Sequence, residues 1–167
     1  MGRSNEAWQT WIDSIPKHEH NHSPTFAFVQ AHRALPKIAL KDLDGNEWAP
    51  DRFTSKTTLA VVWATWCAPC VEELPYFAKI IERLKDRPNV QMVSFNTDDN
   101  PELAKSFMEK NGYKFPVLIA KNFAEDLMPY LSIPRTWIIR DGVVVEEAEG
   151  SGLSWDQWVD RVVAELN

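Results

Sequence analysis

The fold is decided by residues 59–70, Leu-Ala-Val-Val-Trp-Ala-Thr-Trp-Cys-Ala-Pro-Cys. The first six residues are apolar and rich in β-forming types, which is typical of a central buried strand. Apolar residues then recur at helical spacing and predict a helix from about Cys67 to Arg87. The two cysteines of the chain, Cys67 and Cys70, therefore lie where a buried strand passes into a long helix.

Strands and helices alternate along the rest of the chain. The predicted strands are 37–40 and 47–48, joined by a turn at 42–46, then 91–96, 115–120, 136–140 and 143–149. The predicted helices are 101–111, 123–131 and a last one capped by Ser154. Asp141-Gly142 is the strongest hairpin turn. This order predicts an α/β fold with a central mixed β-sheet flanked by helices.

Residues 1–35 are less regular, and we expect them to form an N-terminal extension to a domain over 36–167. Trp8, Trp11 and Ile12 share one helical face and predict a short helix. A polar loop follows at 18–22. Residues 25–33 are compatible with either a capped helix or a strand, because Phe26 and Phe28 alternate.

Composition excludes several classes of function. The chain has 167 residues, 44% of them hydrophobic, which suffices for one packed domain. With 18 basic and 24 acidic residues its net charge is −6, which argues against nucleic-acid binding. The longest apolar stretch, 59–66, is too short to span a bilayer, so we expect no stable membrane insertion. No secretory signal is visible, although a chain that began after a removed signal would look the same.

The cysteine pair indicates thiol–disulfide chemistry. At a helix N-terminus, free backbone N–H groups and the helix dipole favour a thiolate at Cys67. The two-residue spacer places Cys70 one turn below, close enough to resolve a mixed disulfide. Pro69 suits a first helical turn, because its missing N–H would have no partner there. Two cysteines in such a small loop are atypical of a structural disulfide scaffold.

A zinc site is the main alternative for the pair. It needs two further ligands, whereas all four histidines lie upstream, at His18, His20, His22 and His32. The alternating histidines at 18–22 lie in a polar loop and are more typical of solvated side chains than of a metal site. We therefore expect no metal ion.

The motif Trp66-Cys67-Ala68-Pro69-Cys70 resembles the active site of thioredoxins, and the resemblance extends over about residues 36–167. Pro75 matches the proline that kinks the following helix, and Ile133-Pro134-Arg135-Thr136 matches the cis-proline loop of that family. The opening hairpin at 39–45 and an inserted helix–strand unit at 101–120 are similar to the TlpA/ResA branch.

The resemblance implies a protein thiol–disulfide oxidoreductase in which Cys67 attacks and Cys70 resolves. It also implies that Ile133 and a cis-bonded Pro134 shape the substrate edge, together with the exposed rim of the motif at Trp66, Ala68 and Pro69. Trp66 could also be a core residue, and Pro134 a trans proline. No bound cofactor is implied, since electrons come from an upstream dithiol partner. We expect a monomer that acts outside the cytoplasm, with a cytoplasmic location left open. Ala68-Pro69 leaves the direction of electron flow open.

One position departs from thioredoxin. Thioredoxin has a buried aspartate six residues before its first cysteine, and this chain has Val61 there. Glu73 matches a glutamate that tunes the site in some members of the TlpA/ResA branch. It lies three residues after Cys70 and should share its helical face, unlike Glu72. We predict that Glu73 takes part in the cysteine chemistry; the alternative is a solvated surface glutamate.

Three other functions are less compatible with the sequence. A peroxiredoxin-type thiol peroxidase would carry threonine or serine three residues before its reactive cysteine, where this chain has Ala64. A copper-carrying protein of similar fold would need a distal histidine, and none follows His32. A non-enzymatic thioredoxin-like binding module would not need both cysteines.

Overall fold

The computed structural model describes residues 27–128, 130, 132–149 and 154–166. Its strands are β1 (Val29–Ala34), β2 (Leu40–Lys41), β3 (Glu47–Trp48), β4 (Thr57–Trp63), β5 (Val90–Asn96), β6 (Val117–Ile119), β7 (Arg135–Arg140) and β8 (Val143–Glu149). Its helices are α2 (Ala68–Leu84), α3 (Pro101–Asn111), α4 (Lys121–Leu127), α5 (Trp155–Glu165) and the 3₁₀ helix η1 (Pro50–Phe53).

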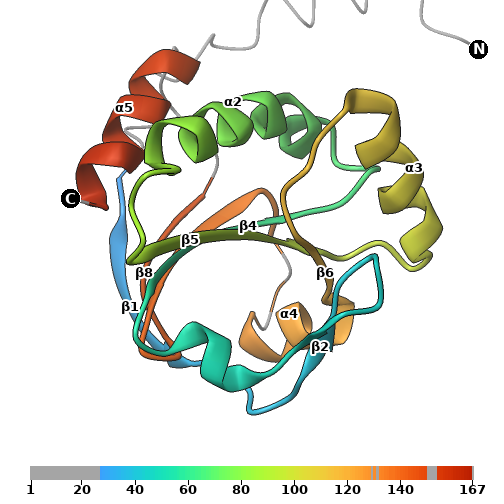
Figure 1. The fold of residues 1–167 in the computed structure, drawn as a ribbon, viewed down its shortest axis with the longest axis horizontal. Coiled ribbons are helices and arrows are strands. Elements are labelled where there is room, and N and C mark those ends of the chain that lie inside the picture. The colour runs from blue at the N-terminus through green and yellow to red at the C-terminus, as the bar shows by residue number, and fades with distance from the viewer. Residues whose placement is uncertain (1–26, 129, 131, 150–153, 167) are drawn as a thin grey trace, which may run out of the picture.

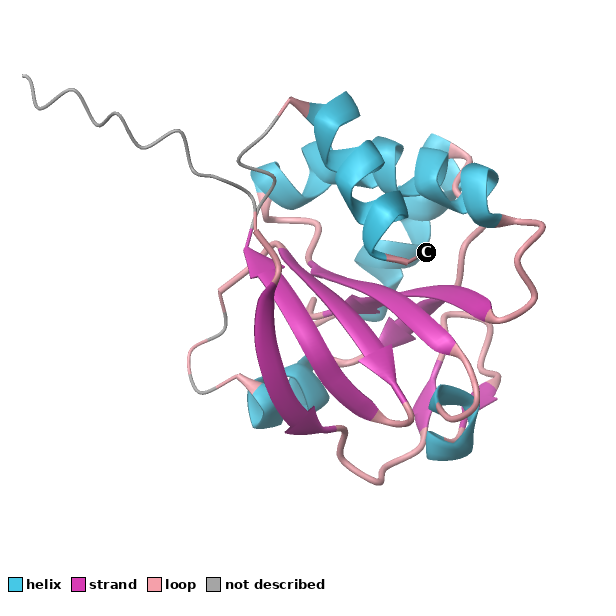
Figure 2. Ribbon diagram, turned by 90° about the vertical axis from the view of Figure 1, so that its left-hand side faces the viewer, coloured by secondary structure: helices cyan, strands magenta, loops and turns pink. Residues whose placement is uncertain are grey.

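Within these residues, six strands form one mixed sheet in the order β1-β8-β7-β4-β5-β6. β4, β5 and β6 run parallel, and the other neighbouring strands pair antiparallel. Helices α2, α3 and α5 cover one face of the sheet, while α4 and the β2–β3 hairpin lie on the other side (Figure 1). The sheet twists between these two layers (Figure 2). This is the expected α/β architecture.

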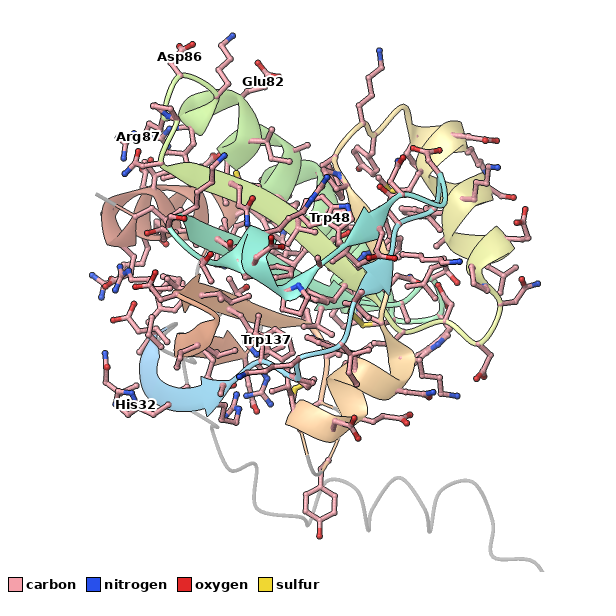
Figure 3. All side chains as sticks on the ribbon, turned by 60° about the horizontal axis from the view of Figure 1, so that its bottom comes forward. His32, Trp48, Glu82, Asp86, Arg87 and Trp137 are labelled. Atoms are coloured by element: carbon pink, nitrogen blue, oxygen red, sulfur yellow. A yellow bond between two sulfur atoms is a disulfide. The ribbon has the colours of Figure 1, made fainter. Side chains whose placement is uncertain are left out.

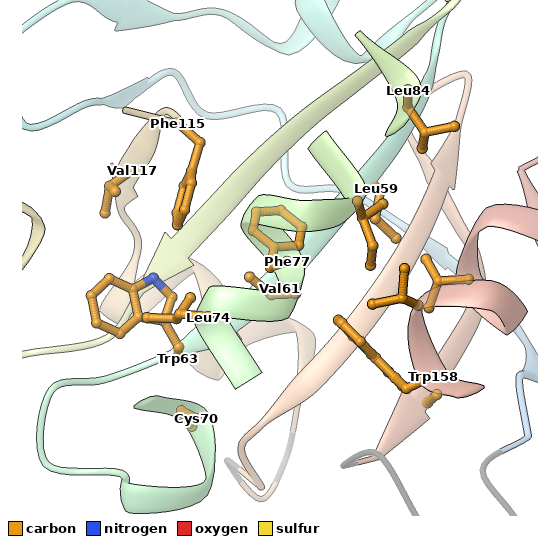
Figure 4. Packing of buried hydrophobic residues seen from close by; sticks show 14 of the residues in the cluster. Leu59, Val61, Trp63, Cys70, Leu74, Phe77, Leu84, Phe115, Val117 and Trp158 are labelled. Carbon is orange, nitrogen blue, oxygen red and sulfur yellow. The ribbon is translucent and has the colours of Figure 1, made fainter. Parts of the chain in front are cut away.

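The central strand β4 explains why both faces need a cover. Its side chains alternate, so that Leu59, Val61 and Trp63 join the core beneath α2, whereas Ala60 and Val62 join the core on the α4 side. Figure 4 shows Leu74 and Phe77 of α2 packed among the first group, with Cys70 at the start of the same helix. The buried end of β4 thus leads directly into the redox motif.

The main correction concerns the segment 1–35. Residues Val29–Ala34 form β1, which pairs antiparallel with β8 and is the outer strand of the sheet. The sheet therefore begins upstream of the domain boundary that we placed at residue 36, and the strand interpretation of 25–33 is correct for the part described. The helix around Trp8–Ile12 and the loop at 18–22 lie outside the described residues.

The other predicted elements are present with small changes at their ends. The β2–β3 hairpin turns through Asp42, whose carboxylate accepts hydrogen bonds from the backbone of Asp44 and Asn46. The helix–strand unit at 101–120 is α3 and β6, and Gly112 ends α3 in a left-handed conformation, with φ of 69°. α2 ends at Leu84 and α4 at Leu127, each earlier than predicted.

Candidate active site

Cys67 is the N-cap residue of α2, directly above the end of β4. Its extended backbone (φ −91°, ψ 96°) breaks from the helix, and the backbone N–H of Cys70 donates to its Sγ at 3.3 Å. The two cysteines are joined by a disulfide, with their Cα atoms 5.3 Å apart. Because this N–H of the first turn points at Sγ, the same geometry favours a thiolate at Cys67 once the disulfide is reduced.

The motif presents its spacer residues to solvent and keeps the second sulfur covered. Trp66 is 67% exposed, and Ala68 and Pro69 are exposed as well. Cys67 is 6% exposed and Cys70 only 1%. Trp66 therefore lies at the rim rather than in the core. A macromolecule that approaches this surface meets Trp66, Ala68 and Pro69 around the edge of Cys67, while Cys70 lies below.

Glu73 is buried on the same helix, at 2% exposure, whereas Glu72 is exposed. The hydroxyl of Thr136 donates to Glu73 Oε1 at 3.2 Å, and Oε2 has no hydrogen-bond partner among the described residues. Burial raises the pKa of Glu73 from 4.5 to about 7, and the hydrogen bond from Thr136 only partly offsets this rise. Residues three apart on a helix share a face, so Glu73 and Cys70, both buried, lie on the same side of α2.

The register of the sheet places the carboxyl group of Glu73 near Val61, the position at which thioredoxin has its buried aspartate. Val61 of β4 lies directly opposite Thr136 of β7. Opposed residues on one face of an antiparallel pair have Cβ atoms roughly 5 Å apart. Thr136, which binds Glu73, is therefore the neighbour of Val61. Glu73 of α2 therefore lies in the same buried layer as the thioredoxin aspartate, which comes from the strand that corresponds to β4.

The loop before β7 contains the proline that was expected to face the cysteines. The Ile133–Pro134 peptide bond is cis, as predicted. Ile133 is partly buried and packs against both core clusters, including the one that contains Cys67 and Cys70. The loop thus packs into both cores and leads into β7, the strand next to β4; its position facing the cysteines stays a prediction.

Within the described ranges, no group of three or more His, Cys, Asp and Glu side chains is arranged to hold a metal ion. His32 is exposed on β1, at the outer edge of the sheet (Figure 3). The histidines at positions 18, 20 and 22 lie outside the described residues. No helix in the described part of the chain has the length and apolar character required to cross a membrane.

Cys67 caps the N-terminus of α2 and forms a disulfide with Cys70 in the first turn of that helix, next to a thioredoxin-like sheet. This combination defines a dithiol oxidoreductase. Residues 30–153 match the Redoxin family, to which the chain belongs. It is 30% identical over 125 residues to the thiol-disulfide oxidoreductase ResA of Bacillus thuringiensis subsp. konkukian, covering 73% of this chain and 71% of the relative. The chain acts by dithiol–disulfide exchange through Cys67 and Cys70.

Solved structures have the same fold. The thioredoxin domain of a thiol-disulfide oxidoreductase from Bacteroides vulgatus is similar with a TM-score of 0.66 and 23% identity, over 83% of this chain and 100% of that one. A secreted disulfide oxidoreductase from Mycobacterium tuberculosis, homologous to E. coli DsbE, is similar with a TM-score of 0.64 and 20% identity. That match covers 77% of this chain and 96% of the other.

Two residues at the site carry contacts that sequence reasoning did not assign. Thr136 belongs to the cis-proline motif, but its bond to Glu73 depends on the register between β4 and β7. Asp98, after β5, accepts hydrogen bonds from Thr65, two residues before Cys67. Neither partner is close in sequence, so no local pattern could have identified these contacts.

Proposed function

We propose that the chain reduces disulfide bonds of proteins outside the cytoplasm, with Cys67 as the attacking thiol and Cys70 as the resolving thiol. The observation that carries the proposal is the arrangement of the motif: an exposed rim around Cys67, and Cys70 covered below beside the buried Glu73. The extracytoplasmic location is supported by the resemblance to the ResA branch and by the likeness to the secreted mycobacterial protein.

The reaction consumes one substrate disulfide and one protein dithiol. The Cys67 thiolate attacks a substrate sulfur, forms a mixed disulfide and releases one substrate thiolate. Ionised Glu73 then takes the proton of the Cys70 thiol, because the pKa of about 7 lets it act as a base near neutral pH. The Cys70 thiolate attacks Cys67 Sγ and releases the second substrate thiolate. The Cys67–Cys70 disulfide that remains is the state in the structure.

The surroundings of the cysteines favour a reductase over a strong oxidant. A strong oxidant stabilises its reduced form, typically through a very acidic thiol. Here ionised Glu73 opposes formation of a second negative charge on the neighbouring sulfurs. An upstream dithiol partner would return the disulfide to the dithiol. We expect the chain to act as a monomer.

The substrate is held by the surface around Cys67. We assign substrate contacts to Trp66, Ala68 and Pro69 on one side and to Ile133 and Pro134 on the other. Pro134 has a backbone carbonyl but no backbone N–H. Any N–H that the loop donates to a substrate must therefore come from a neighbouring residue. An extended substrate segment would pair with this edge beside Cys67.

Trapping tests the assignment of roles. Reduced Cys70→Ser protein should accumulate mixed disulfides with protein substrates, and Cys67→Ser should form none. Equilibration with glutathione should give a reduction potential more negative than about −200 mV, in the range of glutaredoxins and thioredoxin. In intact cells of the source organism, a membrane-impermeant thiol reagent should label Cys67. Peroxide consumption without disulfide reduction would instead indicate a thiol peroxidase.

A further inference from the structure

The short connection between β4 and Cys67 is held by a buried carboxylate. Asp98 follows β5 and is 3% exposed. Its Oδ1 and Oδ2 accept from the backbone N–H of Thr65 at 3.2 and 3.1 Å, and Oδ1 also accepts from the Thr65 hydroxyl at 2.8 Å. Oδ2 further accepts from the side-chain amide of Asn96 at 2.8 Å. Every contact is donated to the carboxylate, so each oxygen acts as an acceptor.

These contacts extend the pairing of β4 and β5 beyond the sheet. The last ladder pair is Trp63 with Asn96, and the backbone N–H of Thr97 donates to the Trp63 carbonyl at 2.9 Å. Asp98 then reaches Thr65, in the segment that leads to Cys67. No Lys or Arg in the described part of the chain forms an ion pair with Asp98. Its neighbours are neutral donors, which is the arrangement that fixes a backbone segment rather than a charge pair.

We propose that Asp98 is a positioning residue for dithiol exchange: through Thr65 it holds Trp66 and Cys67 in place when the disulfide is open. The proposal rests on the exchange chemistry assigned to Cys67 and Cys70. In the oxidised protein the disulfide fixes Cys67 Sγ to Cys70 in the first turn of α2. In the reduced protein that bond is gone. In the structure the Cys67 N–H donates to the Ala64 carbonyl, within the same segment, at 3.2 Å, and the Cys67 carbonyl accepts from the Val71 N–H of α2 at 3.0 Å, so the backbone contacts remain while the link through Sγ is lost. The hydrogen bonds that Thr65 donates to Asp98 then connect the segment to β5, and an ordered nucleophile reacts faster than a mobile one.

The role predicts a difference between redox states. Loss of the Thr65–Asp98 contacts should disturb the reduced form more than the oxidised form, in which the disulfide still restrains Cys67. The thiol–disulfide equilibrium should therefore move toward the disulfide, and attack by Cys67 should slow. A purely structural contact would weaken both forms equally and leave the equilibrium unchanged.

The experiment compares Thr65→Val with Thr65→Ser. Valine removes the hydroxyl donor at similar size and keeps the charge of Asp98, while serine keeps the donor. For Thr65→Val we expect the rate of attack on a disulfide substrate to fall about tenfold, the scale of a hydrogen bond to a charged group. The equilibrium with glutathione should move about tenfold toward the disulfide, or about 30 mV. Thr65→Ser should stay within about twofold of the parent in both measurements.

Asp98→Asn and Asp99→Asn form a second matched pair. The side-chain amide of an asparagine at position 98 would turn its NH₂ group, a donor, toward the donors of Thr65 or of Asn96. At least one of these hydrogen bonds would be lost, so attack by Cys67 should again slow. Asp99 has an 85% exposed side chain paired with Lys121, and its variant should react like the parent. The double variant Thr65→Val/Asp98→Asn should be no slower than the slower single variant, because both remove the same contact.

The outcomes separate the two levels of the proposal. If Thr65→Val matches Thr65→Ser in rate and equilibrium, or if it lowers the melting temperature equally in both redox states and changes nothing else, Asp98 has no positioning role. A parent protein that fails to reduce any disulfide would defeat the exchange function itself. Should Asp98→Asn not fold, the comparison of the two Thr65 variants still decides.

Discussion

Glu73 allows a quantitative test of the site that needs no substrate. Its pKa rises from 4.5 to about 7 because the folded protein buries the carboxyl group, and the hydrogen bond from Thr136 offsets only part of this rise. A shift of this size corresponds to about 3 kcal/mol between the protonation states, at 1.36 kcal/mol per pKa unit. The side chain is 2% exposed, so solvent does not screen this cost appreciably.

The sign of the effect follows from proton binding. Between pH 4.5 and about 7 the folded protein keeps a proton on Glu73 that the unfolded chain has released. The free energy of unfolding therefore falls as the pH rises through this window and levels off above the folded-state pKa. Most of the roughly 3 kcal/mol should be lost by pH 8.

Glu73→Gln should remove this pH dependence. Urea unfolding of the disulfide form, in which the cysteines do not titrate, gives the free energy of unfolding at pH 4.5, 6, 7 and 8. Relative to the parent, Glu73→Gln should gain about 3 kcal/mol between the lowest and highest pH. A constant offset from the altered contact with Thr136 does not affect this difference. Exposed Glu72 is the matched control, and Glu72→Gln should follow the parent curve.

Parallel curves for Glu73→Gln and the parent would refute the reasoning, because they would mean that Glu73 ionises as easily in the folded protein as in the unfolded chain. The proposed proton transfer from Cys70 would then have no base of suitable pKa. A change confined to Glu72→Gln would mean that the other face of α2 carries the buried acid.

Three further predictions address the rim, the sulfurs and the core. In the reduced protein iodoacetamide should modify Cys67 at neutral pH and leave Cys70 protected; equal labelling by mass spectrometry would contradict the assigned roles. Trp66→Ala should raise KM for a protein disulfide several-fold and affect a small disulfide much less, whereas equal effects on both would place Trp66 outside the substrate surface. Phe77→Ala should cost about 3–5 kcal/mol in urea unfolding, because Phe77 is fully buried and packs edge-on against Phe115 at 5.1 Å; a loss under about 1 kcal/mol would contradict the packing.

The elements that the sequence predicts well are those defined by neighbouring residues. The apolar run of β4 and the helical spacing of α2 are local patterns, and so is the turn between β7 and β8. There Asp141 and Gly142 both have positive φ, 50° and 73°, as the predicted Asp-Gly turn requires. The placement of the cysteines at the junction of β4 and α2 follows from the first two patterns alone.

β1 could not be predicted with the same strength. Among Val29–Ala34 only Ala31 is buried, so the strand lacks the alternation of apolar side chains that marks a half-buried strand. It is held by pairing with β8, more than a hundred residues later, and by ion pairs such as that between Arg33 and Glu147. Such pairing is a property of the assembled sheet, and a window of sequence does not contain it.

Glu73 and Asp98 are two buried carboxylates whose partners depend on the assembled sheet and cannot be predicted from neighbouring residues. Helical spacing predicts that Glu73 shares the face of Cys70, but its one donor within the described part of the chain, Thr136, is placed by the register of β7 on β4. Asp98 comes from β5 and accepts from both Thr65 donors and from Asn96. An oxygen of Glu73 remains without a partner among the described residues, so this group has a site left for a proton. The oxygens of Asp98 are engaged by the donors of Thr65 and Asn96, which connect β5 to the segment before Cys67. Two acids of similar burial therefore have different surroundings, and this difference is why we propose different tasks for them: proton transfer at Cys70 for Glu73, and positioning of Cys67 for Asp98.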